Sequence, residues 1–336
     1  MKAAVLHGAC DIRTENIPDP VLEAHAIIIK VKACGICGSD LHVYKRYGKE
    51  GTIFGHEFSG TVVEVGANVT GIKPGECVTA IGFRPCGKCF WCHRGKPHRC
   101  SDIALLGYQF PGAMAEYVAI PFASHGRNVF RLPEELNFED GASVEPLSIS
   151  LFSVKRAQPG EKDTAAVLGA GVIGLNAIQI LKSMGVQRVL ATGRRPSRLE
   201  AARACGADLV VDATKEDVLP AIMETTSGMG VDIVVECAGT QETFDQSVEM
   251  TRGGGKVMLV GVYEQPLAWD PLKVMFKNLT LIGCLGGNFP ASIDLLQSGK
   301  VSTRSFITHR FPLDRAAEAF QVQLQSQDAI KVMIKP

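Results

Sequence analysis

The stretch TAAVLGAGVIGLNAIQILKSMG, residues 164–185, decides how the second half of the chain folds. Its first five residues form a short apolar run that predicts a buried strand. The residues after the glycines show the apolar spacing of a helix that ends at Gly185. Further apolar runs alternate with helical segments as far as about residue 287. This alternation predicts an α/β fold with a doubly wound parallel sheet that is covered by helices on both faces.

The glycines between this strand and this helix follow the pattern G-x-G-x-x-G. At such a junction they permit a tight turn, let the backbone approach a pyrophosphate, and allow the helix to pack closely on the strand. A glycine-rich turn in some other α/β protein is the alternative, but the strand–turn–helix context favours a dinucleotide. The residues expected at the cofactor are Gly169, Gly171, Val172, Ile173 and Gly174.

The end of the second predicted strand indicates which dinucleotide binds. An acidic residue at this position would hold the ribose hydroxyls of NAD. The sequence instead reads ATGRRPSR over residues 191–198, and its arginines suit the 2′-phosphate of NADP. We expect NADP; NAD, with the arginines in a solvated loop, is the alternative. The cofactor residues expected here and at later strand ends are Gly193, Arg194, Arg195, Arg198, Gly239, Val260 and Val262.

Four of the eleven cysteines lie close together in the sequence. Their spacing, Cys86-x2-Cys89-x2-Cys92-x7-Cys100, suits a closed tetrahedral structural zinc. The lobe between the first and the last of these cysteines is too short to form a core of its own, so a metal would order it. Iron–sulfur ligation also fits the spacing. In a cytoplasmic enzyme, clustered cysteines favour metal over disulfides.

A second set of potential metal ligands is dispersed over the first sixty residues. The segments CGICGSDLH (34–42) and GHEFSG (55–60) offer Cys, His and Glu. A catalytic zinc needs about three protein ligands and an open position. The surrounding residues 1–130 consist of short apolar runs broken by Gly and Pro, which predicts a mostly β structure.

Length and charge restrict the classes of function. The 336 residues allow two domains, and 35 Lys+Arg balance 35 Asp+Glu. A zero net charge argues against nucleic acid as a partner, including a zinc-ribbon role for the basic lobe around residues 86–100. No apolar run reaches the ~18 residues of a membrane span, and the N-terminus does not resemble a secretory signal. We therefore expect a cytoplasmic protein.

Taken together, these motifs resemble the zinc-containing medium-chain alcohol dehydrogenases, in the branch of sorbitol (polyol), butanediol and threonine dehydrogenases. The resemblance spans almost the whole chain. GHEFSGTVVEVGANV (55–69) fits the family's zinc signature, and EPLS (145–148) resembles a segment of the polyol branch. The resemblance implies a GroES-like β-rich catalytic domain over 1–149 and 290–336, a Rossmann domain over 150–289, and a homo-oligomer, either dimer or tetramer.

The same resemblance implies the ligands of a catalytic zinc. Cys37 and His56 match two of the family's ligands. Either Glu57 or Glu145 supplies the third, and the sequence does not choose between them. Asp40 resembles the carboxylate that orients the ligand histidine.

Two further residues match the family's proton relay. Ser39 matches the hydroxyl that hydrogen-bonds the reacting oxygen, and His42 a later member that passes the proton to solvent. The alternatives are a helix cap for Ser39 and an ordinary exposed histidine for His42. The aromatic residues Tyr44, Tyr47 and Phe54 are expected either near the substrate entrance or as packing residues.

The expected function is hydride transfer between a secondary alcohol or polyol and a nicotinamide cofactor, with zinc as Lewis acid. A glutamate-containing site suggests a vicinal diol. Two alternatives remain. One is a threonine- or aldose-type dehydrogenase of the same fold, and the other is a non-catalytic sensor that binds NADP and zinc.

Overall fold

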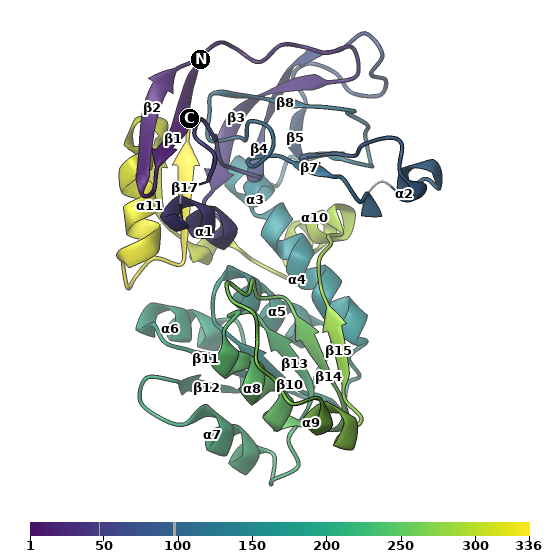
Figure 1. Ribbon diagram of the computed structural model, residues 1–336, viewed down its shortest axis with the longest axis vertical. Coiled ribbons are helices and arrows are strands. Elements are labelled where there is room, and N and C mark those ends of the chain that lie inside the picture. Colours follow the sequence, from purple (N-terminus) through teal and green to yellow (C-terminus); the bar gives the residue numbers. More distant parts are fainter. Residues whose placement is uncertain (47, 97–98) are drawn as a thin grey trace. The chain divides into compact units, whose positions relative to one another are not determined.

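A computed structural model describes the protein over residues 1–46, 48–96 and 99–336. The chain folds into two compact units, whose elements are labelled in Figure 1. One unit is mostly β and the other alternates strands with helices, as the sequence predicts. Across the described residues, no helix combines the length and the apolar character that a membrane crossing requires.

The limits of the two units differ from those that the resemblance implies. The β unit comprises Met1–Glu145, Ile307–Ser326 and Lys331–Pro336, and the α/β unit comprises Pro146–Phe306 and Gln327–Ile330. The chain thus returns to the β unit at residue 307 rather than 290.

Helix α10 (Phe289–Gln297) accounts for this difference, because it belongs to the α/β unit. Its residues line a groove together with residues of helices α4 (Val144–Ala157) and α5 (Val172–Ser183). Just after α10, the side chain of Gln179 forms two hydrogen bonds with the backbone of Ser302, at 2.9 and 3.0 Å.

The β unit is built on a seven-stranded sheet in the order β16-β17-β3-β4-β5-β9, with β8 also paired to β3. A hairpin of β1 and β2 and a small pair of β6 and β7 complete its strands. The strand bounds are β1 Lys2–Gly8, β2 Asp11–Asn16, β3 Ile27–Gly35, β4 Glu57–Val65, β5 Cys77–Ala80, β6 Phe83–Arg84, β7 Ala104–Leu105, β8 Tyr117–Ile120, β9 Val129–Arg131, β16 Ile307–Pro312 and β17 Lys331–Lys335.

Strand β3 is the centre of this sheet and determines where the site forms. Its apolar residues, from Ile27 onward, are buried, and it pairs antiparallel with β4, β8 and β17. The register places Gly35, at the end of β3, opposite both Glu57 and Met333. Three segments that are far apart in the sequence therefore meet at one end of the sheet. The helices of this unit are α1 Gly38–Arg46, α2 Phe90–His93, α3 Phe138–Ala142 and α11 Ala316–Gln325, with a short 3-10 turn, η3, at Leu313–Arg315.

The α/β unit contains a six-stranded parallel sheet in the order β12-β11-β10-β13-β14-β15. This is the doubly wound order of dinucleotide-binding domains, with the chain reversing direction across the sheet between β10 and β13. The strand bounds are β10 Thr164–Leu168, β11 Arg188–Gly193, β12 Leu209–Asp212, β13 Val231–Glu236, β14 Thr251–Leu259 and β15 Thr280–Gly283.

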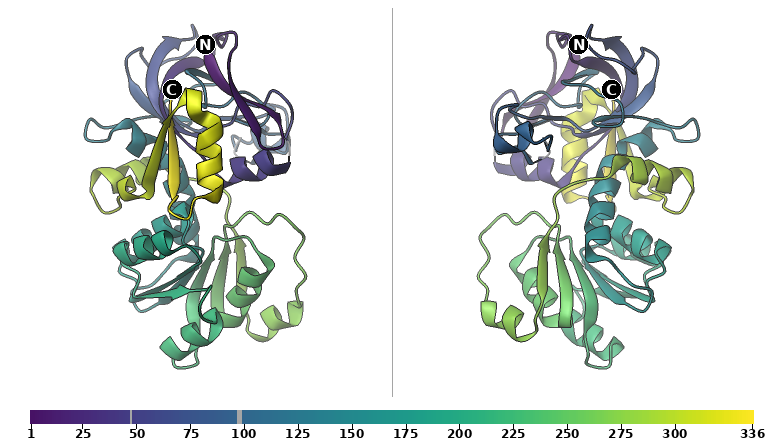
Figure 2. Two further views of the ribbon diagram at one scale, coloured as in Figure 1. Left: turned by 90° about the vertical axis from the view of Figure 1, so that its left-hand side faces the viewer. Right: turned by 90° about the vertical axis from the view of Figure 1, so that its right-hand side faces the viewer.

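Helices cover both faces of this sheet, as Figure 2 shows for the green part of the chain. Besides α4, α5 and α10 they are α6 Pro196–Ala204, α7 Val218–Thr225, α8 Gln241–Met250 and α9 Pro271–Phe276, with a 3-10 turn, η2, at Arg304–Phe306. Buried aliphatic residues of the central strands, among them Leu168, Leu190 and Val234, pack against Val218 and Ile222 of α7. The predicted strands and helices of this half are thereby confirmed.

Candidate active site

Three potential metal ligands meet at the end of β3. Cys37 immediately precedes α1, His56 immediately precedes β4, and Glu57 is the first residue of β4. One ligand atom from each of the three lies within 4.8 Å of the others. The antiparallel pairing of Gly35 with Glu57 produces this cluster, because it places the end of β3 beside the start of β4.

The backbone conformation at position 55 explains why a glycine precedes His56. Gly55 has a φ of +104°, which lies in the region that favours glycine. A Cβ at this position would lie 2.6 Å from Cys34 Sγ and 2.8 Å from Met114 N. Only glycine therefore lets the chain pass this point and direct His56 toward Cys37.

Asp40 orients two members of the cluster, as the resemblance implies. Its Oδ2 accepts a hydrogen bond from the backbone N–H of Cys37 at 3.1 Å, and its Oδ1 lies 3.5 Å from His56 Nδ1. Nδ1 therefore faces the carboxylate, which leaves Nε2 available to a metal. Burial acts to lower the pKa of His56, but the charges of Asp40 and Cys37 outweigh it and raise the pKa well above its usual value.

Lys331 completes this cluster, and the sequence analysis did not identify it. Its Nζ donates to Glu57 Oε2 at 2.5 Å and to the carbonyl of Ile36 at 2.9 Å. The two side chains are only 8% and 3% exposed. Burial acts to lower the pKa of Lys331, but the charges of Glu57 and Cys37 more than offset this and raise it. The available signal was Lys331 beside the apolar run of the terminal strand, where a buried cation needs a partner.

Glu145, the other candidate for the third ligand, lies near this cluster but is not part of it. The group of mutually close donors contains Cys37, His56 and Glu57. Burial raises the pKa of Glu145 to about 7, against the opposing charge of His56 and with a further rise from Glu57. The geometry thus gives the closer position to Glu57 and leaves Glu145 within electrostatic range.

Ser39 lies next to the cluster and connects it to a second residue that the sequence did not reveal. Its hydroxyl donates to Cys37 Sγ at 3.1 Å and accepts from the phenol of Tyr108 at 2.8 Å. Tyr108 follows β7, in a segment without any recognised motif. His42 lies half-buried on α1, one turn after Ser39, and its role stays a prediction.

The aromatic residues near α1 pack in the interior. Tyr44 and Phe54 are buried, and both contact Phe320 of α11, with ring centroids 4.9 and 5.8 Å apart. The Tyr44 hydroxyl donates to the Cys10 carbonyl. These two are therefore packing residues, while Tyr47 lies outside the described residues.

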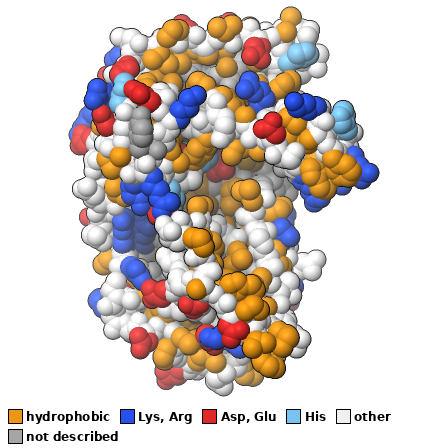
Figure 3. Space-filling view, viewed as in Figure 1, with side chains coloured by type: hydrophobic (Ala, Val, Ile, Leu, Met, Phe, Trp, Pro, Cys, Tyr) orange, Lys and Arg blue, Asp and Glu red, His pale blue; other side chains and the backbone are white. Residues whose placement is uncertain are grey.

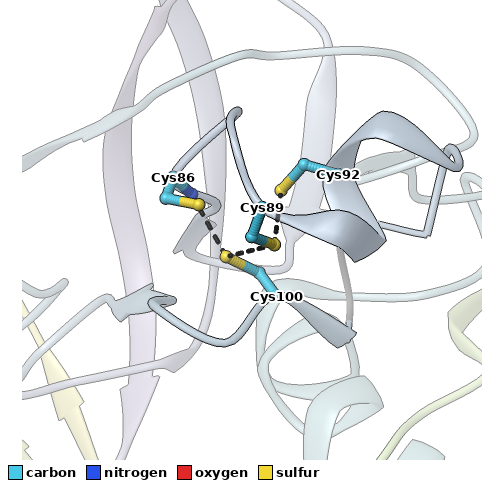
Figure 4. Close-up of side chains that lie close together, drawn as sticks. All are labelled: Cys86, Cys89, Cys92 and Cys100. Carbon is cyan, nitrogen blue, oxygen red and sulfur yellow. Dashed lines mark hydrogen bonds between the residues drawn. The ribbon is translucent and has the colours of Figure 1, made fainter.

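The four clustered cysteines form a second group that could hold a metal ion. Figure 4 shows their sulfur atoms directed toward one another, with Cys89 Sγ 3.5 Å from Cys92 Sγ and 3.8 Å from Cys100 Sγ. Sulfurs around one tetrahedral zinc are about 3.8 Å apart, given Zn–S bonds of about 2.3 Å. Backbone N–H groups of Cys92 and Ser101 lower the pKa of Cys89 to about 5. The sulfur spacing suits zinc.

The glycine-rich loop lies at the carboxyl end of β10 and begins α5. Gly174 approaches the loop so closely that a Cβ there would lie 2.0 Å from the Gly169 carbonyl oxygen. Gly171 is the N-cap of α5 and has no side chain to cap the helix. The first N–H groups of α5 are thus exposed to a ligand, as binding of a pyrophosphate requires.

The arginines after β11 differ in their surroundings. The guanidinium of Arg194 is exposed and forms an ion pair with Glu242 of α8. Arg198 is bound to the backbone of its own unit. Its guanidinium donates to the Ala329 carbonyl at 3.0 and 3.3 Å, and burial lowers the pKa of Arg198 to about 10. Gly193, at the end of β11, packs closely on its neighbours, since a Cβ there would lie 3.0 Å from Leu199 Cδ2 and 3.2 Å from Ala170 Cβ.

Glu236 connects the later strand ends by hydrogen bonds. This is the region where Gly239, Val260 and Val262 were expected at the cofactor. This buried carboxylate ends β13 and accepts the N–H of Gly239 at 2.9 Å. Its other oxygen accepts the Tyr263 hydroxyl at 2.5 Å. The loops after β13 and β14 are thereby held side by side at the carboxyl edge of the sheet, where dinucleotides bind.

Comparison with known proteins agrees with both halves of this structure. The family model described as alcohol dehydrogenase GroES-like domain matches residues 23–134, and the one described as zinc-binding dehydrogenase matches residues 172–298. The chain is 37% identical over 333 residues to L-threonine 3-dehydrogenase of Bacillus licheniformis, covering 95% of this chain and 94% of the relative. It is 32% identical to sorbitol dehydrogenase of Bacillus subtilis, covering 100% of this chain and 97% of the relative.

A solved structure shares the complete fold. It is described as a zinc-binding dehydrogenase from Sinorhizobium meliloti 1021 bound to NADP, and it matches with a TM-score of 0.91 at 31% identity, over 100% of this chain and 99% of that chain. Because the similarity in sequence and in structure extends over the whole chain, the protein belongs to the zinc-binding alcohol dehydrogenase family, in the branch of polyol and threonine dehydrogenases.

Proposed function

We propose that the protein transfers a hydride between a secondary alcohol, in the first place a polyol or vicinal diol, and NADP. The observation that carries the proposal is the partly buried cluster of Cys37, His56 and Glu57, which offers three donor atoms within 4.8 Å of one another. Sorbitol and threonine, named in the relatives, are both secondary alcohols.

The donors of this cluster fit a catalytic zinc. A thiolate, an imidazole and a carboxylate are ligand types that zinc prefers, and three protein ligands leave a position for substrate. Since Lys331 occupies Oε2 of Glu57, we assign Oε1 to the metal. Bound zinc would supply the Lewis acidity that favours loss of the alcohol proton. Glu145 is proposed as a nearby carboxylate that tunes the charge of the cluster.

Ser39 is proposed as the acceptor of the alcohol proton. Its hydroxyl lies 3.1 Å from Cys37 Sγ, and a hydroxyl can accept one proton while it releases its own. His42, on the same helix, is proposed to pass that proton onward to solvent. Nicotinamide, when bound, would accept the hydride, and this part of the chemistry belongs to the cofactor.

NADP is proposed as the cofactor, bound by the α/β unit. The N–H groups at the start of α5 would bind the pyrophosphate, and Arg194 and Arg195 the 2′-phosphate. Two observations support this choice: the β11 end lacks a carboxylate, and the structural relative is bound to NADP. Because Arg198 donates to the Ala329 carbonyl, we assign it to holding the loop after β11 in place. Phosphate binding requires Arg194 to exchange its partner Glu242.

Nicotinamide reduction, followed with a panel of substrates, tests the proposal. Sugar alcohols, vicinal diols, simple alcohols and threonine are supplied with NADP and, in parallel, with NAD. Turnover of diols or polyols with NADP is expected. Cys37→Ser should abolish turnover, while Cys77→Ser, which changes an exposed cysteine on β5, should retain it. A zinc-loaded protein that turns over no alcohol would contradict the proposal and favour the sensor alternative.

Threonine oxidation is the second candidate, because the L-threonine 3-dehydrogenase of Bacillus licheniformis is the relative with 37% identity. The same panel separates the two candidates. A threonine enzyme should require both the amino and the carboxylate group of its substrate. A polyol enzyme should oxidise diols that lack both groups.

We further propose that the protein is a homodimer that joins through one edge of the α/β unit. Within the described part of the chain, β15 is hydrogen-bonded on one side only, and the segment around it carries an exposed apolar patch, in the lower right of Figure 3. An open strand edge and an apolar patch both favour a self-complementary contact across a twofold axis. The residues of the patch are Val262, Trp269, Leu272, Met275, Phe276 and Leu285.

Sedimentation equilibrium tests this assignment. Phe276→Glu, in a side chain that is 76% exposed, should convert the dimer into a monomer. Phe122→Glu, which changes a side chain 55% exposed on the β unit, is the matched control. A wild-type monomer would contradict the proposal, and a tetramer would require a second contact.

The cytoplasm is the proposed location. Both metal sites depend on thiolates, and all eleven cysteines are free. A reducing compartment keeps such thiols available to zinc. Fractionation of cells is expected to recover the active protein with the cytoplasmic enzymes, and recovery with secreted proteins would contradict this assignment.

A further inference from the structure

Tyr108 contacts Ser39 from outside the motifs on which the resemblance was based. It lies 69 residues after Ser39 in the sequence, and its hydroxyl lies 2.8 Å from Ser39 Oγ and 3.3 Å from Asp40 Oδ1. Its ring packs beside the rings of His56 and Phe54, with centroids 5.8 and 6.5 Å apart. The phenol therefore touches both the proton relay and the support of a metal ligand.

The loop that carries Tyr108 is fixed by its backbone. The Tyr108 N–H donates to the Leu105 carbonyl at 3.2 Å, and the Gly107 N–H to the Phe110 carbonyl at 2.9 Å. At Gly107, where φ is +82°, a Cβ would lie 3.1 Å from the backbone nitrogen of Gly55. The loop thus packs directly on the segment that precedes His56, which gives the phenol one defined position.

The hydrogen-bond capacities of these groups determine the direction of the chain of bonds. A phenol has one proton to donate, a carboxylate only accepts, and a serine hydroxyl does both. The shorter contact, with Ser39, takes the proton of Tyr108, and Ser39 in turn donates to Cys37 Sγ at 3.1 Å. Burial, reinforced by the charge of Asp40, raises the pKa of Tyr108, so the phenol remains a donor at neutral pH.

We propose that Tyr108 is a positioning residue for proton transfer at Ser39, holding the serine hydroxyl in the orientation that receives the substrate proton. The inference rests on the proposed function. In alcohol oxidation, the O–H bond of the alcohol breaks and a new O–H bond forms at Ser39 Oγ. The original serine proton leaves its hydrogen bond to Cys37 Sγ, its O–H bond breaks, and it passes to solvent by the route proposed for His42. Tyr108 keeps its own proton throughout. Without it, the Ser39 hydroxyl is free to rotate away from the reacting oxygen.

Tyr108→Phe removes the single hydroxyl and keeps the ring. Loss of one hydrogen bond should lower kcat by about two- to tenfold. The KM for the alcohol should change little. The solvent deuterium isotope effect on kcat should rise, because proton transfer then limits turnover to a greater extent. Tyr117→Phe, which removes the same atom from β8 of the same unit, is the matched control.

A double-mutant cycle separates positioning from a general structural effect. In a Ser39→Ala background, Tyr108→Phe should have no further effect on kcat, because the bond that it breaks is already absent. An equal loss in both backgrounds would overturn the proposal. So would an unchanged kcat and isotope effect in Tyr108→Phe.

A crystal structure of the Tyr108→Phe protein gives a readout that does not depend on activity. Ser39 should occupy more than one rotamer in the variant. A single Ser39 rotamer with its 3.1 Å contact to Cys37 retained would refute the positioning role, even if no substrate had been found. Absence of turnover in the wild-type protein would refute the proposed function instead.

Discussion

Replacing Lys331 with methionine removes the positive charge that pairs with Glu57 inside the β unit. Among the ion pairs of the described residues, Glu57 has no other partner. The pair is joined at 2.5 Å, and its side chains are 8% and 3% exposed. Removing one partner of such a buried pair costs about 3–5 kcal/mol, because the other charge is left without compensation. The Ile36 carbonyl also loses its donor, which adds about 1 kcal/mol. Methionine has a similar length, so little cavity energy is added.

Thermal and urea unfolding of the metal-free protein measure this loss. The summed decrease of about 5 kcal/mol corresponds to a midpoint roughly 10 °C lower. Lys335→Met is the matched control, because this lysine lies on the same strand but is 48% exposed, and its pair with Glu139 is worth about 0–1 kcal/mol. Adding Glu57→Gln to Lys331→Met should restore part of the stability. A loss no larger than that of the control would refute the reasoning.

Three other perturbations test separate parts of the structure. Cys92→Ser should reduce the zinc content from two ions to one per chain and raise hydrogen exchange in residues 86–100, whereas an unchanged zinc content would contradict the structural site. Replacing Arg194 and Arg195 together by alanine should lower the preference for NADP over NAD by at least about tenfold in kcat/KM, since even one charged hydrogen bond to the 2′-phosphate contributes about 1.5–3 kcal/mol. An unchanged ratio would remove both arginines from the site. Hydrogen bonds from Arg310 hold the pKa of Glu139 at about 2, below its usual 4.5, so the stability that the ionised carboxylate contributes is complete above pH 4.5 and is lost as the pH falls toward 2. Acid unfolding of Glu139→Gln should therefore be less steep over this range than that of the wild-type protein, and identical curves would contradict the assignment.

The α/β unit was predictable from the sequence because its signals are local. The apolar run of β10, the glycines after it and the helical spacing of α5 are adjacent in the chain. Each parallel strand is buried on both faces and therefore stands out as an apolar run. The four-cysteine lobe is a local signal as well, since its ligands lie within fifteen residues.

The catalytic cluster was predictable only in part, because some of its contacts are not local. Cys37, His56 and Glu57 lie in motifs, whereas Lys331 arrives from a strand that follows the whole α/β unit. Tyr108 lies in a loop with no pattern of its own. The antiparallel pairing of β17 with β3 brings Lys331 to the site, and no periodicity in the sequence specifies which strands become neighbours.

The return of the chain to the β unit could not be located from composition. Helix α10 has an amphipathic spacing that fits packing against either unit. Its sequence pattern does not show which of the two units it packs against. The groove that α10 lines together with α4 and α5, and the hydrogen bond of Gln179 with Ser302 just after the helix, place this segment in the α/β unit.

The origin of β17 has a consequence for the order of events during synthesis. The thiolate, imidazole and carboxylate of the cluster leave the ribosome early, while Lys331 follows only after the complete α/β unit has emerged. Domains generally fold as units, in the order in which they appear. During translation, Glu57 is therefore an unneutralised carboxylate in an incomplete sheet. Completion of the candidate active site is thus a late step. When Cys37, His56 and Glu57 have left the ribosome, Lys331, whose charge allows Glu57 to be buried, has not yet followed.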